Sequence, residues 1–297
     1  MPKLAVLDIG TNSIHMVLAE VQPDYTYKIL DRFKDMTRLG DGVFTSRRLS
    51  DQAMMRGLEV IRNLVTLARN KGYERIEGVA TSAVREARNG GEFLDHVAQQ
   101  TGLTVRVITR AEEARLIFIG VQNSVALPEP PTLVIDIGGG SVEVIVGNRE
   151  TIYQARSLKL GAIRLKDLYL TKTPPSKPML HELEEAVTSQ LKQALGTYKT
   201  KRVEQIIATS GMAGNLAEVI YLQRTGRPLQ QLNLTKISAK EIAAVEKRLA
   251  DATLKTRLAM PGLDPKRVDT LLPATMVFRI LLDLLRKDEL TICDKAI

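Results

Sequence analysis

The sequence predicts an α/β protein of two domains, and three observations support this prediction. Segments with the strand period of two alternate along the chain with segments that have the helix period of 3.6. A pattern at Val6–Leu18 returns 128 residues later, at Val134–Val146. The length of 297 residues suits two domains of about 100–200 residues each. We place the domains at residues 1–122 and 123–297.

Each copy of the repeat is typical of a β-hairpin with a glycine-rich tip. The copies VLDIGTNSIHMVL and VIDIGGGSVEVIV share an aspartate, an isoleucine, a glycine and a serine at matching places. Each has an apolar run, a turn of small residues and a second run rich in β-branched residues. Two unrelated hairpins are the alternative, because glycine is common in turns. The matching residues favour a duplication.

The two tips have the chemistry of a phosphate site. Glycine lets successive backbone N–H groups point into one concavity, and hydroxyl and amide side chains add further donors. Asp8 and Asp136, at the strand ends, supply hard oxygen ligands for Mg²⁺ or Mn²⁺. We expect the two tips to face each other across a cleft. The residues that we expect to bind phosphate are Thr11, Asn12, Ser13, Gly139, Gly140 and Ser141.

Other parts of the chain predict further elements. Ser50 or Asp51 caps a helix that ends at Gly72, and Thr109 begins a helix with Glu112 at the position of a capping box. Prolines at 128, 130 and 131 predict a linker. Further strands are expected at residues 76–81, 105–108 and 206–209. Further helices are expected from about residue 83 and at residues 91–100, 212–222, 239–251 and 273–286.

The composition indicates a soluble protein with a polyanionic partner. The net charge is +8, which favours nucleic acid, a membrane surface or a phosphorylated molecule. Aromatic residues make up 4% and tryptophan is absent, which argues against nucleic acid. No apolar run approaches the roughly 18 residues of a membrane span, and no signal peptide is evident. We therefore expect a cytoplasmic protein, and the sequence leaves a homodimer open.

Two further residue types exclude other classes of site. The single cysteine, Cys293, cannot form an intrachain disulfide, and the three histidines lack zinc-ligand spacing. We expect no reactive cysteine, no serine–histidine pair and no P-loop that would offer a competing nucleophile or nucleotide cradle. A third turn of small residues, at 209–211, suits an anion or plain strand-to-helix geometry.

Seven motifs follow one another along the chain. They are DIGTNS (Asp8–Ser13), RLGDGV (Arg38–Val43), ATSAVREARNG (Ala80–Gly90), EEARLIFIGV (Glu112–Val121), DIGGGSVE (Asp136–Glu143), ATSGMAGNLAE (Ala208–Glu218) and KRVDTLLPA (Lys266–Ala274). DIGGGS alone is shared with sugar kinases and other actin-like ATPases, but the full set in this order resembles the exopolyphosphatase/guanosine pentaphosphate phosphatase family. The resemblance implies two actin-like, ribonuclease H-like domains with an interdomain cleft, and a catalytic core without the family's C-terminal helical domain.

The resemblance also implies roles for individual residues. Glu113 matches the catalytic glutamate, and a carboxylate at a helix N-terminus is stabilised as the anion that a general base requires. Arg85 matches a phosphate-binding arginine, although a surface ion pair with Glu86 is the alternative. Glu143 occupies the place that His15 holds in the first repeat. The implied catalytic residues are Glu113, Asp136 and Glu143, and the implied metal ligands are Asp8, Asp136 and Glu143.

We therefore expect an exopolyphosphatase that uses Mg²⁺ or Mn²⁺ and a glutamate base to hydrolyse the terminal phosphoanhydride of inorganic polyphosphate. Phosphoryl transfer needs positioning and charge neutralisation more than covalent chemistry. Hydrolysis of guanosine pentaphosphate is the nearest alternative. A regulatory module that binds guanosine tetra- or pentaphosphate without turnover is another, and an ATP-dependent kinase is a third.

Overall fold

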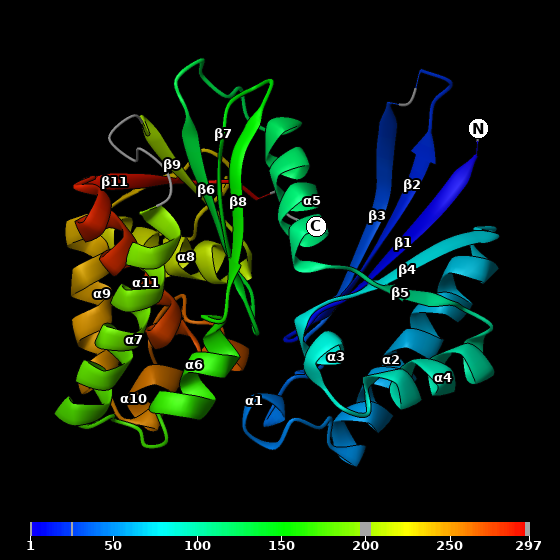
Figure 1. The fold of residues 1–297 in the computed structure, drawn as a ribbon, viewed down its shortest axis with the longest axis horizontal. Coiled ribbons are helices and arrows are strands. Elements are labelled where there is room, and N and C mark those ends of the chain that lie inside the picture. Colours follow the sequence, from blue (N-terminus) through cyan, green and yellow to red (C-terminus); the bar gives the residue numbers. More distant parts are fainter. Residues whose placement is uncertain (1, 25, 197–202, 295–297) are drawn as a thin grey trace. The chain divides into compact units, whose positions relative to one another are not determined.

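The computed structural model describes residues 2–24, 26–196 and 203–294. The chain divides into two compact units, Met1–Arg110 and Ala111–Ile297, and each unit is built on one mixed β-sheet (Figure 1). The elements of the first unit are β1 (Lys3–Ile9), β2 (Ile14–Val21), β3 (Tyr27–Asp35), α1 (Val43–Ser46), α2 (Asp51–Asn70), β4 (Arg75–Ala80), α3 (Ser82–Glu86), α4 (Gly90–Thr101) and β5 (Val105–Val107).

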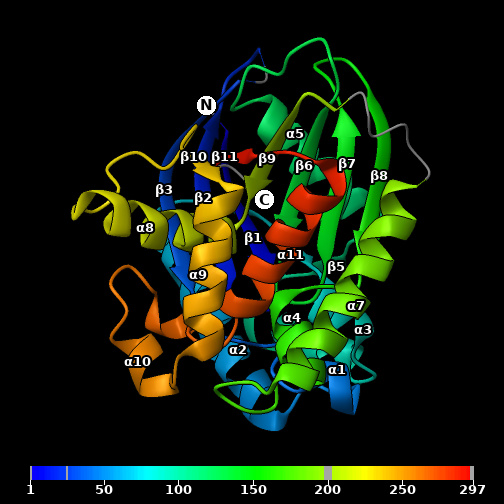
Figure 2. The same cartoon turned by 90° about the vertical axis from the view of Figure 1, so that its left-hand side faces the viewer.

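The second unit has a larger sheet and more helices. In Figure 2, α7 (Lys177–Leu195), α9 (Ala239–Asp251) and α11 (Leu271–Leu285) lie in front of its strands. Its elements are α5 (Arg110–Gln122), β6 (Thr132–Ile137), β7 (Val142–Gly147), β8 (Ile152–Leu158), α6 (Ala162–Tyr169), α7 (Lys177–Leu195), β9 (Gln205–Thr209), α8 (Gly211–Thr225), β10 (Lys236–Ser238), α9 (Ala239–Asp251), α10 (Leu254–Leu258), a 3₁₀ turn (Pro265–Arg267), α11 (Leu271–Leu285) and β11 (Glu289–Ile292).

The two sheets share one topology. The first sheet has the order β3-β2-β1-β4-β5, and the second has β8-β7-β6-β9-β11 with β10 added at the edge. Within each, the first three strands are antiparallel, and the next two run parallel to the first strand of the hairpin. Both predicted hairpins are confirmed. In each tip the glycine N–H donates to the serine carbonyl over 3.0 Å, from Gly10 to Ser13 and from Gly138 to Ser141.

Strands β6 and β7 of the second sheet are buried on both faces, and the alternation of their side chains assigns them to two cores. Leu133 and Ile135 of β6 belong to the large core under α6, α7, α8, α9 and α11. Val134 of β6 and Ile145 of β7 pack instead with α5 on the opposite face. Strand side chains alternate with a period of two, so residues 136 and 143 lie on the α5 face. This face carries the candidate site.

Helix α5 belongs to the second unit, so the boundary between the two units lies earlier in the chain than we expected. We expected the division after residue 122, whereas the compact units divide after Arg110. The reason is packing: Phe118 is fully buried in the core that α5 shares with the second sheet. Its ring lies so close to Gly147 that a Cβ atom there would be 2.5 Å from Cζ. The absence of a side chain at Gly147 lets the helix approach β7.

Most predicted helices are present, with small differences at their ends. Helix α2 begins at Asp51, and the Ser50 side chain accepts a hydrogen bond from the N–H of Ala53, as a cap should. Helix α11 begins at Leu271, two residues earlier than expected. Pro273 therefore lies in its first turn, where the missing N–H has no partner to lose. No helix in residues 2–24, 26–196 and 203–294 is long and apolar enough to cross a membrane.

Replacing Gly147 with alanine is predicted to destabilise the protein. The new Cβ atom would meet both the Phe118 ring and, at 2.7 Å, the carbonyl oxygen of Thr151. Overpacking of this kind costs about 1–3 kcal/mol, which a thermal unfolding curve would record as a lower midpoint. Gly91→Ala is the control, because no atom lies within 4 Å of its added Cβ atom. Equal midpoints for the two variants would contradict the proposed docking of α5.

Candidate active site

Three buried carboxylates meet on the α5 face of the second sheet, and we call them the acidic cluster. Asp136 and Glu143 lie directly opposite each other in β6 and β7. Glu113 comes from the first turn of α5. Their exposed fractions are only 8%, 1% and 8% for Asp136, Glu143 and Glu113. Sequence reasoning predicted all three, and the fold brings them together.

The electrostatics of the acidic cluster favour a bound proton or cation. Burial raises the pKa of the Glu143 carboxyl well above its ordinary value, and the negative charges of Glu113 and Asp136 raise it further. Hydrogen bonds from Ser157, whose Oγ lies 2.7 Å from Oε1, and from Ser141 act in the opposite direction without cancelling the rise. A positive charge beside the cluster would relieve the same repulsion.

The carboxylate oxygens of the acidic cluster suit a divalent cation that takes its other ligands from water and phosphate. Within the described residues, no three His, Cys, Asp or Glu side chains converge on a metal site by themselves. Mg²⁺ commonly binds one or two carboxylates and completes its shell with water and phosphate oxygens. Asp136 and Glu143 match that requirement. Asp8, the third predicted ligand, lies in the first unit, at the end of β1.

The tip between β6 and β7 turns its amide groups outward because its carbonyl oxygens are occupied. The N–H of Ala162 donates to the carbonyl oxygen of Gly138, and those of Ile163 and Arg164 donate to Gly139. Among the described residues, no backbone carbonyl accepts from the N–H groups of residues 139–141. Three consecutive N–H groups without backbone partners form a concavity suited to an anion. The start of α6 therefore prepares the second tip for phosphate.

Two residues that sequence reasoning missed hold this tip in place. The buried Arg164 donates from Nε to the carbonyl oxygen of Gly140 over 2.7 Å. Gly161 lies so close that a Cβ atom there would be 2.3–2.4 Å from backbone atoms of Gly140 and Ser141. A sequence signal existed, because the Leu-Gly pair at 160–161 also occurs at 39–40 after the third strand of the first unit.

The first tip is built in the same way from the RLGDGV motif. The N–H of Gly40 donates to the carbonyl oxygen of Thr11 over 2.8 Å, and that of Arg38 donates to Asn12 over 2.9 Å. Here too, no backbone carbonyl among the described residues accepts from the N–H groups of residues 11–13. The Thr11 hydroxyl accepts from the N–H of Ala83, which ties the tip to α3. Both tips thus present amide groups and hide carbonyl groups.

The first tip contains a contact between a serine and a histidine that sequence reasoning missed. Ser13 Oγ lies 2.8 Å from His15 Nε2. The two residues are two apart at the start of a strand, and side chains with that spacing point to the same side. His15 stands opposite Asp8 in the hairpin register. Sequence reasoning treated Ser13 as a tip residue and His15 as a strand residue, so it did not predict their contact.

The first unit supplies further polar side chains from this tip and from α3. Asn12 Oδ1 and Ser82 Oγ are buried and have no hydrogen-bond partner within the described residues. Arg85, on α3, is half-buried and donates from Nη1 to the carbonyl oxygen of Ile108 over 2.9 Å. Glu86, its alternative partner, pairs with Arg110 at 2.8 Å. That the tips of the two units face each other stays a prediction.

Ser82 is the residue of this group that sequence reasoning missed. The repeat offset of 128 residues also relates ATS at 80–82 to ATS at 208–210, since β4 and β9 occupy equivalent places. The two serines differ in what they do. Ser210, with φ of 97°, caps α8 by accepting from the N–H groups of Met212 and Ala213, whereas Ser82 makes no such cap. The Ser82 hydroxyl, which has no hydrogen-bond partner among the described residues, is available to a ligand.

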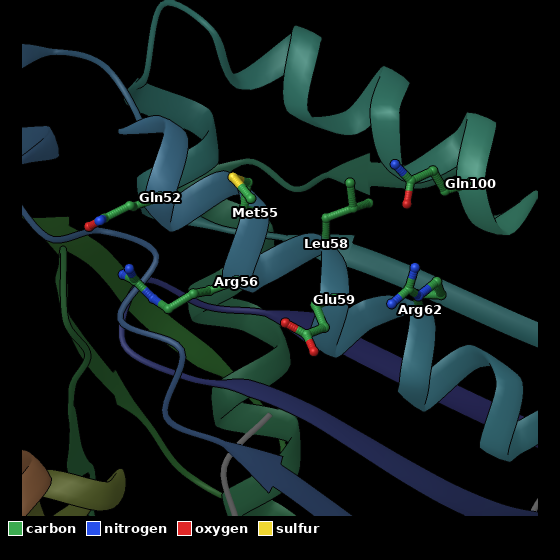
Figure 3. A pocket seen from close by; sticks show the side chains of 7 residues that line it. All are labelled: Gln52, Met55, Arg56, Leu58, Glu59, Arg62 and Gln100. Carbon is green, nitrogen blue, oxygen red and sulfur yellow. The ribbon is translucent and has the colours of Figure 1, made fainter.

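A separate hollow of about 600 Å³ lies on the first unit (Figure 3). Gln52, Arg56 and Glu59 of α2 line it together with Gln100 of α4. None of the predicted site residues borders this hollow. We therefore do not include it in the candidate site.

Matched serine variants separate ligand binding from folding. Ser82→Ala is predicted to leave the unfolding midpoint unchanged or higher, because it removes a buried hydroxyl without a partner. The same variant should bind pyrophosphate about 10-fold more weakly, the usual cost of one hydrogen bond to an anion. Ser210→Ala should instead lower stability by about 1 kcal/mol through loss of the cap. Calorimetric titration and thermal unfolding measure the two effects, and unchanged affinity in Ser82→Ala would remove Ser82 from the site.

Comparison with known proteins agrees with this architecture. Over 311 aligned residues the chain is 29% identical to Exopolyphosphatase 2 of Mycobacterium tuberculosis, covering 100% of this chain and 96% of that protein. The crystal structure of an exopolyphosphatase from Cytophaga hutchinsonii matches with a TM-score of 0.89 at 28% identity, over 99% of this chain and 94% of that one.

A second solved structure, the Aquifex aeolicus member of the Ppx/GppA family, matches with a TM-score of 0.80 at 25% identity, over 99% of this chain and 94% of that one. These likenesses confirm the expected actin-like α/β fold. The family match itself extends over residues 13–297. The chain therefore belongs to the Ppx/GppA phosphatase family.

Proposed function

We propose that this chain is an exopolyphosphatase, in which water attacks the terminal phosphorus of inorganic polyphosphate and releases orthophosphate. Membership of a phosphatase family and likeness to named exopolyphosphatases support a hydrolase that acts on phosphoanhydrides. The observation that carries the proposal is the buried acidic cluster beside a tip whose amide groups have no backbone partner in the part of the chain that the structure describes. Carboxylates and anion donors side by side serve phosphoryl transfer to water.

Each part of the site has a role in this reaction. The N–H groups of residues 139–141 would hold oxygens of the terminal phosphoryl group and stabilise the charge that spreads over them. Glu113 would accept a proton from the attacking water. Arg85 would neutralise charge on the phosphate with its planar guanidinium group. In the first tip, Thr11, Asn12 and Ser13 would bind the neighbouring phosphate.

The proposed cofactor is Mg²⁺ or Mn²⁺, held by Asp136 and Glu143 together with Asp8. When bound, such an ion would neutralise phosphate charge and polarise the phosphoryl group. Burial and the charges of Glu113 and Asp136 disfavour the ionisation of Glu143, which supports this assignment, because a cation beside the cluster would offset both effects. Glu113 would remain outside the metal shell and keep its role as a base.

The glutamate pair of α5 gives the sharpest test of the reaction. Glu113→Gln is predicted to lower turnover about 10²–10⁴-fold, the usual contribution of a general base, while the fold persists. Glu112 lies at the third helical position and is more exposed, so Glu112→Gln should be mild, because glutamine also completes a capping box.

The measurement is phosphate release from long polyphosphate, short polyphosphate, guanosine pentaphosphate and ATP under one set of conditions. Guanosine pentaphosphate presents the same kind of anhydride end and is the nearest rival substrate. The expected result is that polyphosphate releases phosphate faster than the other substrates do. This release should be lost in Glu113→Gln but not in Glu112→Gln. Release from guanosine pentaphosphate only would replace the proposed substrate, and equal losses in both glutamine variants would refute the division of roles.

The acidic cluster is expected to support activity while lowering the stability of the fold. Asp136→Ala and Glu143→Ala are predicted to reduce turnover sharply, and excess chelator should abolish it in the wild type. Glu143→Gln should also lose activity, yet unfold at a higher temperature than the wild type at neutral pH in chelator. The buried Glu143 carboxyl must either carry a charge that burial and its neighbours disfavour or take up a proton, whereas glutamine is neutral. Full activity in chelator would end the metal hypothesis. A lower midpoint for Glu143→Gln would contradict the repulsion.

A further inference from the structure

The serine–histidine pair of the first tip occupies the same place as a serine–glutamate pair in the second tip. Ser13 and His15 correspond to Ser141 and Glu143 at the repeat offset of 128 residues. In the second tip the Ser141 hydroxyl makes a hydrogen bond to the Glu143 carboxyl. A serine hydroxyl has a single hydrogen to donate. The Ser141 hydroxyl therefore donates its one hydrogen to an acceptor in the protein.

Histidine reverses this arrangement, because its ring nitrogen can carry a hydrogen. Ser13 Oγ and His15 Nε2 are 2.8 Å apart, so one of the two donates to the other. An ionised phosphate oxygen only accepts hydrogen bonds, so a serine that binds it must donate its one hydrogen to the phosphate. The lone pair of Ser13 Oγ that faces the ring can then accept a hydrogen bond, and a hydrogen on His15 Nε2 would supply it.

We propose that His15 is a positioning residue whose Nε2–H donates to Ser13 Oγ and thereby directs the serine hydroxyl toward a phosphate oxygen in the first tip. The inference rests on the proposed function, because the substrate's phosphate is the anion that Ser13 receives. It goes beyond that function by giving the two repeats different tasks. The first tip binds phosphate with a hydroxyl donor, and the second commits its serine to the acidic cluster.

The test measures the affinity for pyrophosphate by calorimetry, which does not depend on turnover. His15→Phe removes the donor, and His15→Gln keeps an N–H group at nearly the same reach. His15→Phe and Ser13→Ala should each weaken binding about 10- to 100-fold, the loss expected for a hydrogen bond to a charged group. The double variant should be no weaker than either single variant, because the two residues act through one bond. His15→Gln should stay within about 3-fold of the wild type, since its amide can still donate.

Two further measurements separate this role from other roles of the pair. The chain has three histidines, and the other two, His96 and His181, are exposed on helices. Nitrogen NMR should therefore show a hydrogen on Nε2 of His15 that exchanges slowly when pyrophosphate is bound, with His96→Gln as a variant that changes neither binding nor this signal. The intact mass of the protein during polyphosphate turnover should show no added phosphoryl group, because Ser13 donates a hydrogen and does not attack phosphorus.

Several outcomes would overturn the inference. These are wild-type affinity in His15→Phe, additive losses in the double variant, loss of affinity in His15→Gln equal to that in His15→Phe, an Nε2 atom without hydrogen, or a phosphorylated Ser13. Unfolding midpoints of all variants show whether a loss comes from misfolding, and His15→Gln keeps the comparison valid if His15→Phe does not fold. If the wild type binds pyrophosphate in the expected pattern but releases no phosphate from polyphosphate, the proposed function fails and this inference stands.

Discussion

Backbone carbonyl oxygens in both tips accept hydrogen bonds from the segment that follows the third strand of each sheet, and these bonds decide which side of a tip an anion can approach. In the first unit the donors are the N–H groups of Arg38 and Gly40, and in the second they belong to the first turn of α6. A carbonyl oxygen left open would repel phosphate. Once the carbonyl groups are bonded, the remaining N–H groups make each tip electropositive. Each anion site thus needs two parts of the repeat, the hairpin and the segment with the Leu-Gly pair that follows the third strand.

The acidic cluster shows the cost of such a site. Its three carboxylates lie in a buried environment, where burial and the charges of Glu113 and Asp136 disfavour the ionisation of Glu143. The fold tolerates this because β6, β7 and α5 are fixed by apolar packing: Phe118 rests against Gly147, and the same face buries Val134 and Ile145. Packing energy therefore holds together groups that would otherwise separate, a common arrangement at functional sites.

How far the sequence predicts this molecule depends on how local each signal is. The helix capped by Ser50 and the two hairpins follow from short-range patterns, and the structure has them where expected. Strand β3 was missed because it is an edge strand with charged side chains on both faces, so its period is weak. The side chains of Arg164 and Ser157 reach the site from α6 and β8, which lie outside the hairpin. Patterns in a single sequence do not show which separate elements come together in space. The homodimer and the cytoplasmic location stay predictions.

The decisive measurement is a crystal structure of the Glu113→Gln variant with tripolyphosphate, because the slowed enzyme would retain its substrate. Oxygens of the terminal phosphoryl group should accept hydrogen bonds from the N–H groups of residues 139–141. An oxygen of a preceding phosphate should meet the N–H groups of residues 11–13 and the Ser13 hydroxyl. Tripolyphosphate bound away from both tips, or against their carbonyl side, would contradict this arrangement.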